Sequence, residues 1–281
     1  MQMKTDRTYI KRIVRLLLNS LLLSSLLLNS SCDNIAEEER LIYEAPPTVN
    51  RSVLIEDFTG QRCVNCPNAA DEIHSLQQEY GEDVVIAVGI HGGPMAVWIN
   101  PEKGIVGLAT ETGDNYNTYW KVEQWPMGMV NRGGVTPYTN WKGLVREELQ
   151  KTAPVSLSAE FNQAAGAKSG KIQLSLEGTQ GNTTAKLQIW VVEDDIQAIQ
   201  LMPDGKANAD YIHQHVFRTA VNGEWGEDFS VKEGEVKKYD YTLTFADDWV
   251  PEHLSIVAFA YNDQGVLQVI RCTLNTLNIR N

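Results

Sequence analysis

The sequence is poor in cysteine and in basic residues, and each shortage excludes a class of protein. Its 281 residues include four cysteines, too few for a small domain held together by several disulfides. Lysine and arginine together number 24, against 36 aspartate and glutamate residues, and the formal charge is −12. A nucleic-acid partner is therefore not expected, because the phosphate backbone attracts basic surfaces.

A second pair of closely spaced cysteines is also missing. Cys63 and Cys66 form one C-x-x-C pair, whereas a structural zinc site usually takes its four ligands as two such pairs. Cys272 and the histidines would complete a zinc site only by chance geometry. Zinc is the main alternative for this pair, but we expect neither a metal nor any other cofactor.

Uninterrupted apolar runs of membrane-spanning length are lacking as well, although residues 1–31 are rich in leucine. Serine and asparagine break the apolar part, which follows five basic residues and ends in small residues before Cys32. This order predicts a secretory signal peptide over residues 1–31. Cys32 resembles the lipidated cysteine of a bacterial lipoprotein, although Leu28 lies one place earlier than the usual leucine. The alternative is ordinary cleavage nearby, which would leave Cys32 as a free thiol.

Residues 32–47 read as a tether, with an acidic first part and two prolines at the end. The acidic stretch also resembles the surface-export signals of some Gram-negative anaerobes; alternatively, its charge only keeps a linker extended. Because the first 31 residues carry five basic side chains and one acidic one, the remainder has a formal charge of about −16. Its roughly 250 residues suit two domains of ordinary size.

Residues 53–92 organise the first of these domains, which we place at residues 48–152. A short apolar strand leads to the two cysteines, a helical pattern follows, and residues 84–90 form a second, fully apolar strand. Pro67 suits the first position of the helix and Gly81 the position just past its end. This order predicts a strand–helix–strand unit of a parallel sheet buried on both faces. The apolar stripe of the helix is Ala69, Ile73, Leu76 and Tyr80.

The cysteines lie at the start of this helix, where the chemistry of a thiol changes. Free N–H groups and the positive end of the helix dipole stabilise a thiolate, and Arg62 adds a nearby cation. We therefore expect a reactive Cys63 on the outer side of the turn, with Cys66 shielded inside the first helical turn.

The stretch resembles a thioredoxin-like domain, in which C-x-x-C occupies this turn and an Asp-Phe pair precedes it, here Asp57 and Phe58. The resemblance implies that Cys63 is the nucleophile, that Cys66 resolves the mixed disulfide and that Asp57 is a buried proton acceptor. It also implies a cis peptide bond at Pro126, which would face the cysteines.

Two departures from the thioredoxin pattern leave the redox potential and the substrate range open. Val64 and Asn65 replace the Gly-Pro dipeptide of thioredoxin, and Arg62 replaces its tryptophan.

His91 follows the second strand in a glycine loop, at the carboxyl end of the strand, where binding and catalytic sites gather. It either tunes the cysteines or is an ordinary loop histidine.

From Pro154 onward, seven short alternating runs separated by glycine, asparagine and aspartate turns predict an all-β sandwich over residues 153–281, immunoglobulin-like or fibronectin-like. The gap between Asp194 and Asp210 is expected to be a loop, either a binding loop or a crossover. Cys272, in the last run, is expected to be a free, partly buried thiol. The runs are 155–161, 171–177, 185–192, 211–218, 237–245, 254–261 and 266–274.

His213 and His215 alternate in the fourth run and are expected to share one face of its strand with Tyr211 and Phe217. Two imidazoles at this spacing can bind a metal. A half-buried sheet face is the favoured interpretation, because no acidic residue or third histidine lies nearby as a further ligand.

The whole arrangement resembles the outer-membrane-protein-28-related family of Gram-negative anaerobes. The resemblance lies in the lipoprotein signal, the C-x-N-C-P motif, the segment 126–132 and the sandwich runs that contain residues 215–218 and 254–259. It implies an outer-membrane lipoprotein on the periplasmic or the cell-surface face, anchored to the membrane by lipid.

Two functions remain open. The first is thiol-disulfide exchange with the thiols or disulfides of envelope proteins. The second is a non-enzymatic surface protein for binding or assembly that uses the thioredoxin-like domain as a scaffold, because a fold alone does not establish an activity.

Overall fold

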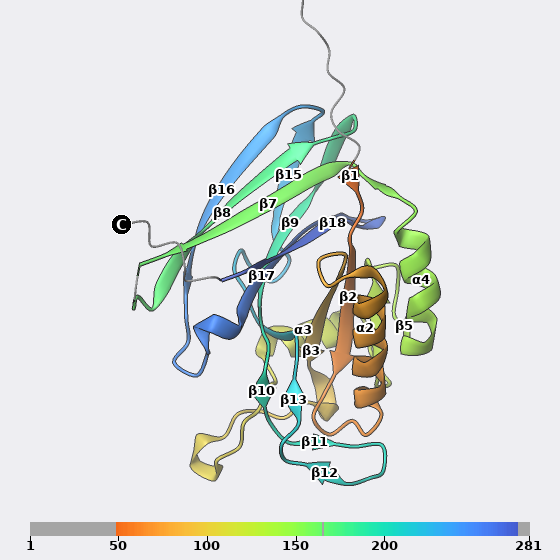
Figure 1. Cartoon of the computed structure of the whole chain (residues 1–281), viewed down its shortest axis with the longest axis vertical. Coiled ribbons are helices and arrows are strands. Elements are labelled where there is room, and N and C mark those ends of the chain that lie inside the picture. Colours follow the sequence, from red (N-terminus) through yellow and green to blue (C-terminus); the bar gives the residue numbers. More distant parts are fainter. Residues whose placement is uncertain (1–48, 165, 275–281) are drawn as a thin grey trace, which may run out of the picture. The chain divides into compact units, whose positions relative to one another are not determined.

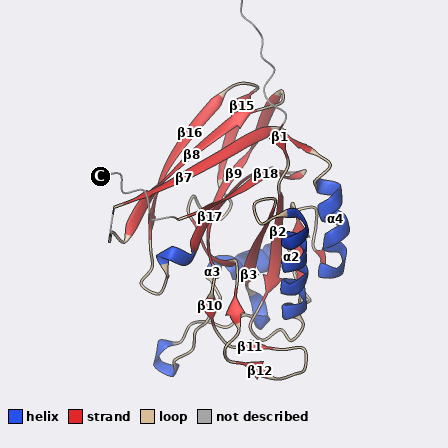
Figure 2. Cartoon of the chain, in the orientation of Figure 1, coloured by secondary structure: helices blue, strands red, loops and turns tan. Residues whose placement is uncertain are grey.

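A computed structural model of the chain describes residues 49–164 and 166–274. The signal peptide, Cys32 and the tether lie outside the described residues. Pro46–Asn281 forms a single compact unit, so the unit runs across the boundary that the sequence predicts after Thr152. The described part is mostly β-strand with few helices (Figure 2). None of its helices is both long enough and apolar enough to cross a membrane.

The described α-helices are α2 (Cys66–Tyr80), α3 (Glu111–Tyr119) and α4 (Trp141–Glu148). The strands of the first half are β1 (Val49–Asn50), β2 (Val53–Thr59), β3 (Val85–His91), β4 (Met127–Val130), β5 (Thr136–Pro137) and β6 (Thr152–Ala153). The longer strands of the second half are β7 (Val155–Gln163), β8 (Ser169–Gly178), β9 (Asn182–Glu193), β14 (Val216–Ala220), β15 (Glu227–Lys232), β16 (Val236–Thr244), β17 (Leu254–Asn262) and β18 (Gly265–Thr273). Short strands between β9 and β14 are β10 (Ile196–Gln197), β11 (Gln200–Leu201), β12 (Ala207–Asn208) and β13 (Ile212–His213).

The expected strand–helix–strand unit is confirmed by β2, α2 and β3. Strands β2 and β3 pair in parallel along their whole length. Pro67 lies in the first turn of α2, and Gly81 ends the helix at a φ of 99°, a left-handed value that glycine adopts without strain. The apolar stripe of α2 packs on the sheet together with Val53, Ile55, Val85, Ala87, Val130, Trp141 and Val145.

Strand β2 has two buried faces of different character, because successive side chains point to opposite sides of a sheet. Val53 and Ile55 belong to the core beneath α2. Leu54 and Phe58 point the other way, into a second core that includes residues of β3, α3, β9 and β17. Asp57 therefore lies on the α2 face, toward the end of β2 that leads to the cysteines.

One nine-stranded sheet contains strands from both halves of the chain, in the order β18-β17-β9-β14-β3-β2-β4-β5, with β15 also paired to β9. The joint is β14, which pairs antiparallel with β9 and parallel with β3. Figure 1 labels these two neighbours, β9 and β3. The sequence assigns this run to the separate sandwich, whereas the structure places it beside the strand that follows α2.

A three-stranded sheet, β16-β8-β7, covers part of this large sheet. Apolar side chains from β7, β8 and β16 share a core with those of β9, β15, β17 and β18. Six of the seven predicted runs are continuous strands. The run 211–218 is broken into β13 and β14, and the sequence analysis missed β15.

A buried ion pair lies on the face of β2 opposite to the disulfide. The Arg132 guanidinium donates two hydrogen bonds to Oε1 of Glu56, from Nε at 3.1 Å and from Nη2 at 3.0 Å. The side chains are only 3% and 1% exposed. Aromatic rings surround the cation, with its Cζ 4.2 Å from the ring centre of Tyr261 and 4.9 Å from that of Phe259. Packing and charge thus fix the register of β2 against its neighbours.

We predict that Arg132→Met destabilises the protein by about 3 to 5 kcal/mol, because it leaves the Glu56 carboxylate buried without its cation. Urea unfolding at pH 7 measures the change. The matched control is Glu79→Gln, which removes the exposed pair between Glu79 and Lys142, with side chains 43% and 56% exposed. This control should have little effect on stability, because an exposed ion pair gains little over its separate hydration. Equal losses in the two variants would contradict the prediction.

Candidate functional site

Cys63 and Cys66 form a disulfide at the turn between β2 and α2. Cys66 is the first residue of α2 and Cys63 lies three residues before it. Gly60 lets the neighbouring loop approach this turn, since a Cβ there would lie 2.4 Å from the backbone of Met95. The amide of Arg62 donates to the carbonyl of Met95 at 2.9 Å, and the Arg62 side chain points into solvent.

Asp57 is a buried carboxyl group close to this disulfide. Its side chain is 5% exposed, and its Oδ1 has no hydrogen-bond partner among the described residues. Burial raises the pKa of Asp57 from 3.8 to about 8. The group is therefore mainly protonated at neutral pH and can exchange a proton with a thiol, whose ordinary pKa is about 8.5.

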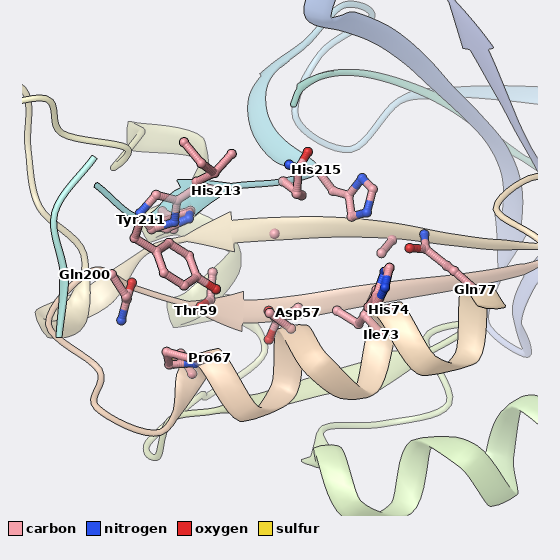
Figure 3. A pocket seen from close by; sticks show the side chains of 17 residues that line it. Asp57, Thr59, Pro67, Ile73, His74, Gln77, Gln200, Tyr211, His213 and His215 are labelled. Atoms are coloured by element: carbon pink, nitrogen blue, oxygen red, sulfur yellow. The ribbon is translucent and has the colours of Figure 1, made fainter. Parts of the chain in front are cut away.

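A cavity of about 110 Å³ connects Asp57 with the disulfide (Figure 3). Cys66 and Pro67 line it from α2, and Tyr211 and His213 line it from the segment between β9 and β14. In Figure 3, the Tyr211 ring lies beside His213, whereas His215 lies apart from both. The cavity thus brings a sulfur, a protonated carboxyl and a phenol to one place.

His91 and His213 meet beside the cavity as an edge-to-face pair, with ring centres 5.4 Å apart. Burial lowers the pKa of His91 well below 6.5, and the neighbouring His213 adds to this shift. Burial also lowers the pKa of His213 to about 4. Both rings are therefore neutral at pH 7. His91 thus lies at the cavity that Cys66 lines. That it tunes the cysteines stays a prediction.

A segment that the sequence analysis left as a loop covers the disulfide turn. Gln200 donates from Nε2 to the carbonyl of Cys63 at 2.8 Å, and the amide of Leu201 donates to the carbonyl of Gln61 at 2.9 Å. The Gln61 side chain donates in turn to the carbonyl of Ile199 at 3.2 Å and accepts from the amide of Leu108 at 3.1 Å. Residues 199–201, here called the cover, are therefore hydrogen-bonded to the turn that holds Cys63.

The cover corrects one expectation about the cysteines. Cys63 was expected on the outer side of the turn and Cys66 shielded inside the first helical turn, but both residues are buried, at 4% and 3% exposed. Cys66, rather than Cys63, lines the cavity. The prediction of unequal exposure is wrong for this oxidised state, because the cover packs against the outer side of the turn. The roles of the two thiols in catalysis stay predictions.

Sequence reasoning missed Gln61 and Gln200, because a glutamine in a polar turn looks like any exposed residue. The one available signal was the length of the gap between Asp194 and Asp210, which is longer than most connections between strands.

The peptide bond before Pro126 is cis, as the thioredoxin resemblance implies. Pro126 is buried and directly precedes β4, whose residues Met127 and Gly128 pair with Phe58 and Asp57. It thus lies at the end of the sheet where β2 leads into the disulfide turn. Its direct contact with the cysteines stays a prediction.

His213 and His215 do not share one face of a continuous strand. The backbone of His215 has a φ of 56°, which breaks the run between β13 and β14. Its Nδ1 lies 2.9 Å from Oδ1 of Asp194, and Asp194 also pairs with Arg271. Among the described residues, no group of three or more histidine, cysteine, aspartate or glutamate side chains is placed to hold a metal ion.

Cys272 is a free thiol of intermediate exposure on β18, where it pairs with Ile256 of β17. Burial raises its pKa. This expectation of the sequence analysis is confirmed.

We predict that Asp57→Asn stabilises the oxidised protein in a pH-dependent manner. Because the pKa of Asp57 is higher in the folded state, the unfolded carboxyl ionises first and stability is lost as pH rises through this window. The gain from Asp57→Asn should be near zero below about pH 4, grow up to about pH 8 and reach at least about 2 kcal/mol. Urea unfolding across this range measures it.

Asp71→Asn is the matched control, since Asp71 is an exposed residue of α2. Because its side chain is exposed, its replacement should change the stability little. A constant effect of Asp57→Asn at every pH would contradict the assignment of a raised pKa.

Comparison with solved structures gives the fold of the described part. HBP35 of Porphyromonas gingivalis is similar with a TM-score of 0.62 and 15% identity, over 82% of this chain and 77% of that one. A protein of Agrobacterium tumefaciens is similar with a TM-score of 0.51 and 14% identity, over 84% of this chain and all of the other. At these identities, both likenesses concern the fold alone.

The sequence of this chain is also similar to outer membrane proteins. A domain of the outer membrane lipoprotein Omp28 from Porphyromonas gingivalis shares 27% identity over 44% of this chain and 89% of its own length, with a TM-score of 0.33. No curated protein matches the chain. The family model of the outer membrane protein Omp28 matches residues 113–278, more than half of the chain. The protein therefore belongs to the Omp28 family of outer membrane proteins and is a protein of the cell envelope.

Proposed function

We propose that the protein is an envelope lipoprotein that exchanges thiols and disulfides through Cys63 and Cys66. The observation that carries the proposal is the disulfide at the start of α2 with the buried Asp57 at the same cavity, its pKa raised to about 8. In this proposal β2, α2, β3 and β4 form a thioredoxin-like arrangement. The β-sheets of residues 153–281 form an immunoglobulin-like sandwich.

The exchange follows from the positions of the two thiols, with Cys63 in the turn before α2 and Cys66 at the first residue of the helix. In the reducing direction, the Cys63 thiolate attacks a substrate disulfide, forms a mixed disulfide and releases one substrate thiolate. Asp57, ionised for this step, accepts the proton of Cys66, and the Cys66 thiolate attacks the Cys63 sulfur. The second substrate thiolate leaves as the protein disulfide forms. Two electrons thus pass from the protein dithiol to the substrate disulfide, and the oxidising direction is the reverse.

The substrates in this proposal are the thiols or disulfides of other envelope proteins. A nucleic-acid partner is not expected, because the chain carries a formal charge of −12.

We predict that Cys66→Ser traps mixed disulfides between Cys63 and envelope proteins, because the thiol that resolves them is gone. Cys63→Ser should trap none, and Cys272→Ser, which changes the free thiol of β18, serves as the matched control. Non-reducing gels of cells that express each variant measure the capture. A folded Cys66→Ser protein that captures nothing would end the proposal.

A second function is favoured by the burial of both sulfurs beneath the cover. In this alternative the disulfide is structural, and the protein binds or assembles at the surface without catalysis. The disulfide would then have a reduction potential below about −300 mV, which is typical of structural disulfides in exported proteins. A potential well above this value favours exchange.

The lipid anchor of the proposal rests on Cys32, which follows the basic and apolar segments of the signal peptide. We predict that fatty-acid labelling of the protein is lost in Cys32→Ala, while labelling of Cys272→Ser is unchanged. Labelling that persists in Cys32→Ala would show that the lipid is attached elsewhere.

A further inference from the structure

A second hollow, distinct from the cavity at the disulfide, is a groove of about 660 Å³ on the described unit. It lies between the end of α3, the first part of β9, the turn before β15 and the turn between β17 and β18. Its aromatic lining is Tyr119, Trp120, Trp225 and Tyr261. None of these residues takes part in the proposed thiol chemistry, so the two sites can be tested separately.

The aromatic rings of the groove form a connected surface. Tyr119 is 61% exposed, and its ring centre lies 4.3 Å from that of Trp225 and 5.0 Å from that of Trp120. Arg132 lies at the base, with its cation over the rings of Tyr261 and Trp120. The Tyr119 ring is tilted by 49° against that of the half-buried Trp225, so the pair presents apolar ring surface to solvent.

The turn that carries Trp225 is held in place by its neighbours. The Tyr116 hydroxyl donates to the carbonyl of Glu224, and the Tyr261 hydroxyl donates to the carbonyl of Trp225 at 2.7 Å. Gln188 donates from Nε2 to the carbonyl of Gly223 at 2.8 Å. The aromatic surface is therefore preorganised, which lowers the entropy cost of binding a ligand to it.

The rim of the groove is polar and rich in hydrogen-bond acceptors. Carboxylates come from Asp228 and Asp263, and an amide from Asn262. Lys186 is the cation of the rim, and its Nζ lies 2.9 Å from Oδ1 of Asp228. This balance disfavours an anionic ligand and suits a neutral one that offers hydroxyl donors.

We propose that this groove binds a neutral saccharide. The C–H faces of a sugar ring stack on Tyr119 and Trp225, while its hydroxyl groups donate to the carboxylates of Asp228 and Asp263. A proline-rich peptide also fits aromatic grooves, but its prolines have no N–H to donate to Asp228 and Asp263, whereas each sugar unit offers several hydroxyl donors. The volume suits a few sugar units, since small-ligand pockets measure about 300 to 1,000 Å³.

The test is calorimetric titration of the protein with maltohexaose, cellohexaose, chitohexaose and a linear mannohexaose. At least one should bind, with a dissociation constant below about 1 mM. Tyr119→Ala should weaken this binding by about tenfold or more, whereas Tyr119→Phe keeps the ring and should retain it. The matched control is Trp98→Ala, which removes an aromatic residue that is 51% exposed but lies outside the groove lining.

Tyr119 is exposed enough that its replacement should leave the fold intact, and an unchanged thermal unfolding curve verifies this. The proposal is overturned if none of the four saccharides binds, or if Tyr119→Ala binds as well as the wild type. It is also overturned if a proline-rich decapeptide binds at the groove and the saccharides do not. Trapping by Cys66→Ser is unaffected by any of these results, so the failure of one proposal leaves the other standing.

Discussion

The parallel pairing of β14 with β3 is the interaction on which the rest of the structure depends. Val216 lies opposite Gly89, and the amide of Gly89 donates to the carbonyl of His215 at 2.8 Å. Strand β9 ends at Glu193 beside the start of β14, so the 22 residues between them leave the sheet at the carboxyl end of β3. Because β2 and β3 are parallel, β2 leads into α2 at this same end, and binding and catalytic sites of such sheets lie at the carboxyl ends of the strands. The cover therefore reaches the disulfide as a consequence of strand order.

The polar groups enclosed near the disulfide are matched to their surroundings by staying uncharged. At neutral pH the Asp57 carboxyl is protonated, and the imidazole rings of His91 and His213 are uncharged. Charging any of the three would leave an ion in a site with few hydrogen-bond partners, which is costly. The amide groups of Gln61 and Gln200 satisfy backbone carbonyls without adding charge. The ion pair of Glu56 with Arg132, the most deeply buried among the described residues, lies on the other face of β2.

Local patterns were enough to predict the parts of the fold that local forces determine. The β2–α2–β3 unit follows from Pro67, Gly81 and a helical apolar stripe, all of which lie within 40 residues of one another. The free thiol of Cys272 follows from cysteine spacing. Six strands of the second half follow from short apolar or alternating runs bounded by turn residues. Of these, β7, β8 and β16 have one face against a core, whereas β9 and β17 contribute side chains to two cores.

The features that the sequence did not predict depend on pairing between distant residues. Alternation places His213 and His215 on one strand, but the strand is interrupted between them. His215 contacts Asp194, whereas His213 contacts His91. Similarly, nothing in residues 211–218 indicates that this run pairs with β3 as well as with β9. Gln200 is recognisable as part of the site only once the cover is seen to lie on Cys63.

The adjacent carboxyl groups of Glu56 and Asp57 make β2 intolerant of any shift along its own axis. One is ionised against a guanidinium among aromatic rings, and the other is neutral beside the sulfurs. A single inserted or deleted residue in β2 would exchange the two faces and place each group in the environment suited to the other. The two carboxyl groups together therefore constrain the length of this seven-residue strand. The hairpin of β11 and β12, whose tip at Asp204 and Gly205 is exposed, is free to vary in length.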